Sequence, residues 1–201
     1  MMQTILPMKI TDCDKVAVLH IQNLRGVYRE EAGSKILQCY YSALVQSRGG
    51  CGYVAIMNGE LVGYICGVWD WKLIRERLLY QYILKLAAWG LVQILTYPGM
   101  ILQFRNRAIR GNPAGNENRM GYELRPIVVA PAARRHGIGA QLIHTLVEDA
   151  RGRNFDRIFL FTEHDNEPAK RLYQNFGFQL VGKEQLNSTY YLRYELPLSR
   201  S

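Results

Sequence analysis

The spacing of hydrophobic and polar residues along this chain follows two periods, which together predict a mixture of strands and helices. A period of two residues, or a short apolar run, is typical of a strand, whereas a period near 3.6 is typical of a helix. By these patterns we expect strands at residues 4–10, 51–57, 60–68, 122–130, 157–162, 178–181 and 188–196. We expect helices at residues 12–24, 34–46, 71–97, 100–109, 140–153 and 167–176. The pattern as a whole indicates an α/β fold.

Short polar residues and glycines mark the ends of several of these elements. The Asn-Gly pair at 58–59 predicts a type I′ hairpin turn between its two neighbouring strands. Thr11 is expected to be the N-cap of the first helix, with Asp14 three residues later completing a capping box. Asn166 is expected to cap the last helix, which Gly177 should close.

Residues 128–140 combine the end of a strand, a proline-containing turn and the start of an amphipathic helix. Gly137 and Gly139 precede that helix, and glycines let backbone N–H groups turn outward toward a ligand. The helix N-terminus adds its dipole and its unpaired N–H groups. Arg134 and Arg135 add guanidinium groups suited to phosphate oxygens. The stretch predicts a pyrophosphate site, although its glycines alone also fit an ordinary turn between a strand and a helix.

The same stretch resembles motif A of the GNAT (N-acetyltransferase) superfamily, whose pattern is Val-x-Pro followed by Arg/Gln-x-x-Gly-x-Gly/Ala. The specified positions are filled by Val129, Pro131, Arg134, Gly137 and Gly139. A second segment typical of the family follows at residues 166–173, with Phe-Gly-Phe at 176–178. The resemblance covers residues 4–69 and 121–197.

The resemblance implies a single GNAT-like domain over residues 1–201. Its expected fold is a GNAT-like α/β sandwich: a mixed, mostly antiparallel central sheet with a splayed pair of parallel strands and flanking helices. Residues 70–120 are not explained by the resemblance, and we expect them to form a helical insertion between strands.

Acetyl-CoA is the co-substrate that the resemblance implies. Its pantetheine arm would pair with the backbone of residues 127–129 in the gap between the splayed strands, and its phosphates would bind at the glycine-rich turn. No metal ion is implied. The resemblance therefore assigns cofactor binding to Ile127, Val128, Val129, Arg134, Arg135, His136, Gly137, Ile138, Gly139, Ala140 and Asn166.

The family reaction is direct attack of an amine on the thioester, which requires a base for the ammonium proton and a proton donor for the leaving thiolate. Glu123 is the first candidate base, and Glu163 and His164 are alternatives. Each of them could also be an ordinary solvated side chain without a role in catalysis. Tyr173 matches the family tyrosine that serves the thiolate, although it also lies at core spacing. The resemblance thus makes Glu123 and Tyr173 the catalytic candidates.

The amino-acid composition excludes few classes of binding partner. The net charge is +8, which suits a polyanion such as coenzyme A, anionic lipid or nucleic acid. No helix-turn-helix, RNP or zinc-finger pattern accompanies the charge, so we expect no nucleic-acid partner. The four cysteines follow no metal-ligand or disulfide spacing, and the N-terminal residues lack the pattern of a secretory signal. We therefore expect a cytoplasmic protein.

The segment at residues 71–110 is apolar but carries seven basic residues. Its longest apolar run, residues 87–95, is too short to span a bilayer, which takes about 20 residues. Two alternatives stay open: an interfacial helix pair that makes peripheral contact with a membrane, or a helical hairpin packed on the domain or across a homodimer.

Together these features predict an acetyl-CoA-dependent N-acetyltransferase acting on a primary amine, which could be a small amine, an amino sugar or a protein amino group. The alternative is a non-catalytic module that binds acyl-CoA or docks on a membrane through the insertion.

Overall fold

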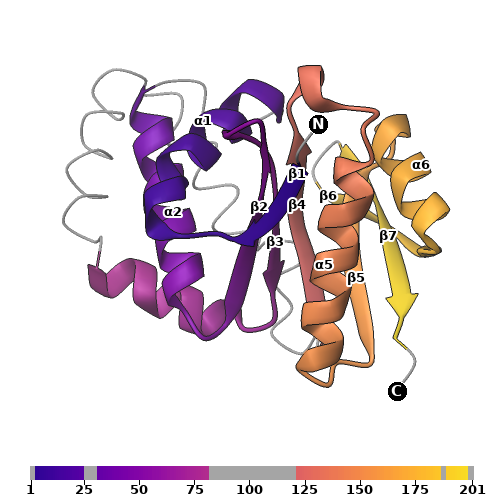
Figure 1. Cartoon of the computed structure of the whole chain (residues 1–201). Coiled ribbons are helices and arrows are strands. Elements are labelled where there is room, and N and C mark those ends of the chain that lie inside the picture. Colours follow the sequence, from indigo (N-terminus) through magenta and orange to yellow (C-terminus); the bar gives the residue numbers. More distant parts are fainter. Residues whose placement is uncertain (1–2, 25–30, 82–120, 187–188, 199–201) are drawn as a thin grey trace.

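The computed structural model describes residues 3–24, 31–81, 121–186 and 189–198. Within these ranges the strands form one seven-stranded sheet in the order β1-β2-β3-β4-β5-β7-β6. All neighbouring strands are antiparallel except β4 and β5, which are parallel. The mixed, mostly antiparallel sheet expected from the sequence is confirmed (Figure 1). Its strands are β1 (Gln3–Pro7), β2 (Gly50–Met57), β3 (Glu60–Val68), β4 (Tyr122–Val129), β5 (Arg157–Glu163), β6 (Gln179–Leu186) and β7 (Thr189–Pro197).

The helices are α1 (Cys13–Asn23), α2 (Glu31–Gln46), α5 (Ile138–Gly152) and α6 (Glu167–Phe176), with short 3-10 turns at Ile10–Asp12 and Pro131–Ala133. Residues 71–81 are also helical, which agrees with the start of the predicted insertion. The rest of that insertion, including the expected helix at 100–109, lies outside the described residues.

Most local predictions of element ends are confirmed, and one is wrong. The hairpin turn has φ of 52° at Asn58 and 84° at Gly59, as a type I′ turn requires. Asn166 caps α6, and Gly177 ends it with φ of 100°. Thr11, however, is not a helix N-cap, because it lies inside the 3-10 turn that precedes α1. The carboxylate of Asp12 instead accepts the backbone N–H of Lys9 at 2.8 Å, which stabilises that turn.

Two hydrophobic cores form on opposite faces of the sheet. The side chains of α5, including Leu142, Ile143 and Leu146, pack with α6 and one face of the strands. Helices α1 and α2 pack on the other face, over β2, β3 and the nearer part of β4. Figure 1 shows α5 lying along the strands, with α1 and α2 together at the N-terminal side of the sheet.

The parallel strands β4 and β5 diverge from each other, and we call the V-shaped opening between them the fork. The two strands pair only through Tyr122 with Ile158 and Glu123 with Phe159, although both continue for several residues beyond this point. On its other side β4 stays paired with β3 up to Val129. The splayed strands predicted from the sequence are therefore present, and among the described residues one edge of β4 has no strand partner beyond Glu123.

A bulge in β4 lies just beyond the fork. Ile127 pairs with Ile65 and Arg125 pairs with Cys66, so Pro126 is the extra residue in the ladder. Proline has no N–H to donate, so it is tolerated at a bulge. The bulge changes which side chains of β4 point to each face along the strand.

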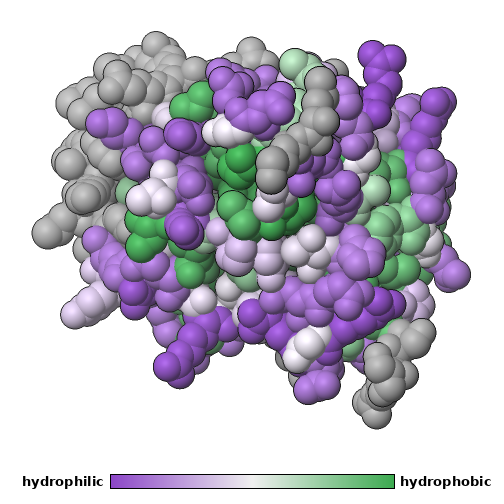
Figure 2. All heavy atoms as spheres, viewed as in Figure 1, coloured by the Kyte–Doolittle hydropathy of each residue, from purple (hydrophilic) through white to green (hydrophobic). Residues whose placement is uncertain are grey.

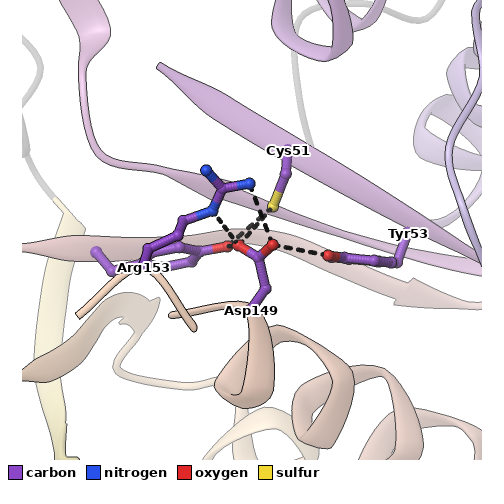
Figure 3. Close-up of polar contacts among 5 residues, drawn as sticks. Cys51, Tyr53, Asp149 and Arg153 are labelled. Atoms are coloured by element: carbon purple, nitrogen blue, oxygen red, sulfur yellow. Dashed lines mark hydrogen bonds and ion pairs between the residues drawn. The ribbon is translucent and has the colours of Figure 1, made fainter. Parts of the chain in front are cut away.

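The C-terminal end of α5 is attached to the sheet through the carboxylate of Asp149. It accepts hydrogen bonds from the hydroxyls of Tyr53 (2.9 Å) and Tyr122 (2.7 Å), and from Nε of Arg153 (2.7 Å). Figure 3 shows Cys51, Tyr53 and Arg153 gathered around this carboxylate. The guanidinium of Arg153 also stacks 4.2 Å from the ring centre of Trp69. This polar cluster ties α5 to β2 and β4 at the end of the helix remote from the glycine-rich turn.

The surface in Figure 2 is hydrophilic over the C-terminal end of α5, and hydrophobic surface gathers between α1 and α5 over the edge strand β1. Leu6 of β1 is 45% exposed, in keeping with an edge position. Among the described helices, none is both long and apolar enough to cross a bilayer.

Candidate functional site

The glycine-rich turn between β4 and α5 exposes the N-terminus of a helix. Arg135 and Gly137 both have left-handed backbone conformations, with φ of 65° and 76°. Alternating left-handed residues of this kind turn backbone N–H groups toward one side and form an anion-binding concavity. Gly137 is the N-cap of α5 and provides no side-chain cap. The first intrahelical bond runs from the N–H of Gln141, so the N–H groups of Ile138, Gly139 and Ala140 point out of the helix.

Arg134 is fixed at the edge of this turn. Its Nε donates to the carbonyl of Val129 at 3.0 Å, and its Nη2 donates to Oδ1 of Asn23 at the end of α1. His136 contacts the carbonyl of Arg134 through Nδ1 at 2.9 Å. The side chains of Arg134, Arg135 and His136 are all exposed. These cationic and polar groups therefore surround the helix N-terminus and remain accessible to an anion.

The free edge of β4 begins directly beside this turn. The N–H of Ala130 donates to Val62 of β3, so by strand alternation the N–H and C=O of Val129 point away from β3, toward the open side of the fork. The bond from Arg134 to the carbonyl of Val129 agrees with this direction. The backbone N–H and C=O of Ile127, two residues earlier, point the same way as those of Val129. The side chain of Val128 is buried in the core beneath α1 and α2. The backbone of 127–129 thus offers a donor–acceptor edge to an extended ligand.

Glu123 lies at the vertex of the fork. Its side chain is on the face opposite α5, because Tyr122 and Leu124 on either side belong to the α5 core. Glu123 is only 4% exposed, and its Oε1 is 2.7 Å from Nε of Arg125. An adjacent guanidinium favours the ionised form of a carboxyl group. The predicted base is therefore held at the vertex as a buried carboxylate in an ion pair.

Arg125 was not singled out by the sequence, and its neighbour Trp71 was considered only as part of the segment at 71–110. The guanidinium of Arg125 lies 4.8 Å from the centre of the Trp71 ring, which in turn stacks on Tyr40 of α2 at 6.0 Å. Residues 123 and 125 necessarily share one face of a strand, so the ion pair had a weak sequence signal. The contact with Trp71 had none, because it joins elements far apart in the chain.

Tyr173 lies on α6 with its ring in the core. It packs edge-on against Phe178 at 5.8 Å and contacts Tyr194 at 6.3 Å. Burial raises the pKa of Tyr173, so its phenol stays protonated at neutral pH and can act as a hydrogen-bond donor. Its helix packs close to the glycine-rich turn, since a Cβ on Gly139 would be 3.4 Å from the side chain of Leu172.

The remaining candidates differ in how tightly they are held. The Oδ1 of Asn166 accepts the N–H of Ala169 at 3.3 Å, so this side chain serves as the cap of α6. Glu163 ends β5 beyond the fork and is partly exposed. His164 follows it and donates its backbone N–H to Tyr190. Both come after Phe159, the residue of β5 that pairs with Glu123.

A second polar cluster, which the sequence did not predict, is buried between α1, α2 and β3. Nδ1 of His20 lies 2.6 Å from the hydroxyl of Tyr41 and 3.0 Å from that of Tyr64. Burial lowers the pKa of His20 to about 4, so the imidazole is neutral at neutral pH and can accept a hydrogen bond from one of these hydroxyls. Tyr41 is fully buried in this cluster.

Comparisons with known proteins agree with the resemblance seen in the sequence. A family model described as the Acetyltransferase (GNAT) family matches residues 101–178. A curated relative, the chloroplastic GCN5-related N-acetyltransferase 6 of Arabidopsis thaliana, is 35% identical over 81 residues, which are 38% of this chain and 28% of that protein. The N-alpha-acetyltransferase RimI of Mycobacterium tuberculosis is 41% identical over 61 residues, or 30% of this chain and 37% of that protein. The chain thus matches only about a third of each relative.

Solved structures agree over nearly the whole chain. A Salmonella typhimurium protein, determined with its cofactor acetyl-CoA, superposes with a TM-score of 0.63 at 16% identity. The match covers 99% of this chain and 95% of that one. At this identity the likeness concerns the fold alone, and it confirms the predicted fold class.

Proposed function

We propose that the chain is an N-acetyltransferase that transfers the acetyl group of acetyl-CoA to a primary amine, because a GNAT family model matches residues 101–178 and acetyltransferases are among its relatives. The observation that carries this proposal is the continuity between the turn at 134–140 and the free edge of β4. An anion-binding helix N-terminus leads directly into an unpaired strand edge, which leads to a buried carboxylate at the vertex of the fork. A long ligand with phosphates at one end and an amide-containing arm fits this order.

The turn supplies the contacts for the phosphates. N–H groups of Ile138, Gly139 and Ala140 are directed outward, and the positive end of the α5 dipole stabilises negative charge there. Arg134 and Arg135 add positive charge, and His136 lies beside them. The amide groups of the pantetheine arm would pair with Ile127 and Val129 as an added strand does. Asn166, at the start of α6, would approach the cofactor through the part of its side chain that the cap does not use.

The reaction begins with attack of the amine nitrogen on the thioester carbon. The C–N bond forms, the C–S bond breaks, and coenzyme A leaves as a thiolate. Holding both reactants in this geometry supplies much of the rate enhancement. The ammonium must first lose a proton, and Glu123 accepts it directly or through a water molecule. Tyr173 donates a hydrogen bond or proton to the thiolate, which its protonated phenol permits.

The acceptor belongs to the small amines, amino sugars or protein amino groups. The name of the Mycobacterium tuberculosis relative, an N-alpha-acetyltransferase, favours an α-amino group. Our proposed localisation is the cytoplasm, where acetyl-CoA is available.

A thiol-release assay tests the proposal. Wild-type protein should release coenzyme A from acetyl-CoA in the presence of at least one amine in a panel of amino acids, polyamines, amino sugars and peptides. Glu123→Gln should lower kcat by about 100-fold, a typical contribution of a general base, and should lose the rise in rate toward alkaline pH. Glu148→Gln removes a carboxylate from the exposed face of α5 and serves as the control.

The opposite result would favour the non-catalytic alternative. A protein that binds acetyl-CoA by calorimetry, yet releases no thiol with any amine in the panel, would be a binding module. Wild-type turnover in Glu123→Gln would instead show that the protein is an enzyme in which Glu123 is not the base.

For the segment at 71–110 we propose peripheral contact with an anionic membrane, with a homodimer interface as the alternative. Within the described part, Leu79 and Tyr80 are 47% and 90% exposed, and Arg75 and Glu76 are exposed beside them. Cosedimentation with vesicles containing anionic lipid should be strong at low salt and weaken as salt screens the basic residues. A protein that ignores these vesicles and forms a dimer by light scattering would show that the segment is an oligomerisation element.

A further inference from the structure

The side chain of Glu123 lies on the face of the sheet opposite α5, because the other face is filled by the α5 core. The sheet register places Phe159 of β5 directly beside Glu123. Phe161 follows on the same face and packs edge-on against Phe159 at 6.1 Å. Arg125 stands on β4 one step beyond Glu123 on this face. A molecule bound here would contact a carboxylate, a guanidinium and an aromatic wall.

Arg125 has unused hydrogen-bonding capacity in this position. Its Nε lies 2.7 Å from Oε1 of Glu123 as an ion pair, but this contact does not have the geometry of a hydrogen bond. Its Nη2 is buried, with no hydrogen-bond partner in the part of the chain that the structure describes. The indole Nε1 of Trp71, in the ring over which Arg125 lies, is in the same situation. Another such donor, Nε of Arg193, lies farther along the face, over the ring of Phe159.

Buried donors without partners are costly, and in folded proteins they commonly mark the place of a ligand, ion or water. A guanidinium prefers oxygen anions and matches the two oxygens of a carboxylate through parallel N–H groups. Here a cation with a free N–H and a buried carboxylate are held side by side, at the ion-pair distance of 2.7 Å. The complementary ligand carries an ammonium and a carboxylate equally close together.

We propose that Glu123 and Arg125 together recognise the two charges of an α-amino acid, so that the acceptor is a free amino acid rather than a peptide, a polyamine or an amino sugar. This inference rests on the proposed function for its chemistry but makes a separate claim about binding. The α-ammonium group lies against Glu123, which later accepts its proton. The α-carboxylate lies against Nη2 of Arg125. The side chain of the amino acid packs along Phe159 and Phe161, which favours an apolar residue.

Three acceptors with the same isobutyl side chain test this proposal. Leucine carries the carboxylate, leucinamide replaces it with a neutral amide, and 3-methylbutylamine lacks it. For wild-type protein, kcat/KM for leucine should exceed that for leucinamide by about 100-fold or more, since a site built to pair with a charged group discriminates strongly against its absence. Equal rates for leucine and leucinamide, or a higher rate with a peptide N-terminus, would overturn the inference.

Variants assign the preference to Arg125. Arg125→Gln should reduce the preference for leucine over leucinamide to within about threefold, because the carboxylate loses its partner. Arg125→Lys keeps the charge but not the paired donors, so it should retain an intermediate preference. The control is Arg157→Gln, which removes an exposed arginine from the same face of the sheet, where it is ion-paired with Asp156 and Glu195. It should leave the preference unchanged. A full preference in Arg125→Gln would contradict the assignment.

A binding measurement separates this inference from the proposed function. Wild-type protein saturated with coenzyme A is titrated with leucine and with leucinamide by calorimetry, which requires no turnover. Tighter binding of leucine, lost in Arg125→Gln, supports the inference even if no amine is acetylated. Equal binding of both compounds overturns it even if the enzyme is active with another amine. Because the comparison of two ligands on wild-type protein is itself decisive, the test survives the failure of any variant to fold.

Discussion

Asp149 shows how one side chain can hold an element in place at the residue scale. Its carboxylate accepts hydrogen bonds from four side chains, which come from β2, from β4 and from Arg153 just after α5 (Figure 3). Burial raises the pKa of Asp149, but the hydrogen bonds from Arg153, Tyr122 and Tyr53 outweigh burial and hold the pKa below its ordinary value. The folded state therefore favours the ionised carboxylate.

We predict that Asp149→Asn lowers the free energy of unfolding by about 1–3 kcal/mol at pH 7, the usual effect of leaving buried polar partners unsatisfied. Since the folded-state pKa is below the unfolded value of about 3.9, this stabilisation is present above that pH and is lost as pH falls through the folded pKa. Urea unfolding at pH 7 and pH 3 should show the difference between variant and wild type shrinking in acid.

Glu148→Gln is the matched control for Asp149→Asn. Glu148 is the preceding residue of α5 and pairs with Arg151 on the exposed surface. Its loss should cost less than about 1 kcal/mol, as for surface ion pairs in general. A difference between Asp149→Asn and wild type that stays constant from pH 7 to pH 3 would mean that the carboxylate charge is not what stabilises the cluster.

Tyr173 gives a second prediction at this scale, and it concerns catalysis. Tyr173→Phe keeps the ring that packs on Phe178 and Tyr194, so the melting temperature should change little. The variant loses the proton donor for the thiolate, so kcat should fall by about 100-fold with little change in KM for acetyl-CoA. Steady-state thiol release measures both constants. Tyr190→Phe, at an exposed tyrosine, is the control, and an unchanged kcat in Tyr173→Phe would exclude the hydroxyl from the reaction.

At the scale of the element, the start of α5 depends on backbone conformation more than on side chains. Gly137 has φ of 76° and no atom lies within 4 Å of a Cβ built on it, so a side chain there would be strained rather than crowded. Gly59 in the β2–β3 hairpin has the same two properties, with φ of 84°. The two glycines therefore form a matched pair, one at the proposed phosphate site and one away from it.

We predict that Gly137→Val and Gly59→Val each destabilise the protein by about 1–2 kcal/mol, because a side chain with a positive φ carries that cost. Only Gly137→Val should weaken acetyl-CoA binding, by at least about tenfold, because it changes the direction of the N–H groups at the helix start. Titration calorimetry measures both affinities. Equal affinity in both variants would show that the phosphates bind elsewhere.

At the scale of the whole molecule, β4 and β5 join the N-terminal and C-terminal parts of the sheet through only two residue pairs. Helices α5 and α6 share one core with strands from both parts. The edge of β4 beyond the fork is thus supported from one side by β3 and left free on the other. A ligand that fills the fork would add the missing backbone partner.

We predict that saturating acetyl-CoA slows amide hydrogen exchange at residues 127–129 and 138–140 more than elsewhere. At 100 times Kd the cofactor also stabilises the whole fold by about 2.7 kcal/mol. Mass spectrometry of peptides from these segments measures the effect, and peptides from the β2–β3 hairpin provide the comparison. Protection that rises equally across all peptides would argue against insertion of the cofactor in the fork. At a cofactor concentration near the wild-type Kd, Gly137→Val should show a weaker local effect than wild type.

Hydrophobic periods, turn residues and motif spacing in the sequence determined most of the elements and the place of the glycine-rich turn. The hairpin at 58–59, the cap at Asn166 and the end of α6 at Gly177 depend on contacts within a few residues, which a local pattern contains. The family motif likewise indicated the splayed strands. The prediction for Thr11 failed because the preference of a residue type for a cap position does not decide between two neighbouring candidates. The carboxylate of Asp12 stabilises the turn instead.

Tertiary structure alone decided which distant side chains meet. One register across β2, β3 and β4, together with the position of α5 over these strands, brings together Cys51, Tyr53, Tyr122 and Asp149. Many registers satisfy the same alternation of apolar and polar residues, and each would bring different side chains together. The contact of Arg125 with Trp71 is of this kind. The sequence could therefore propose Glu123 as a base, whereas only the folded chain showed the guanidinium and the aromatic ring that surround it.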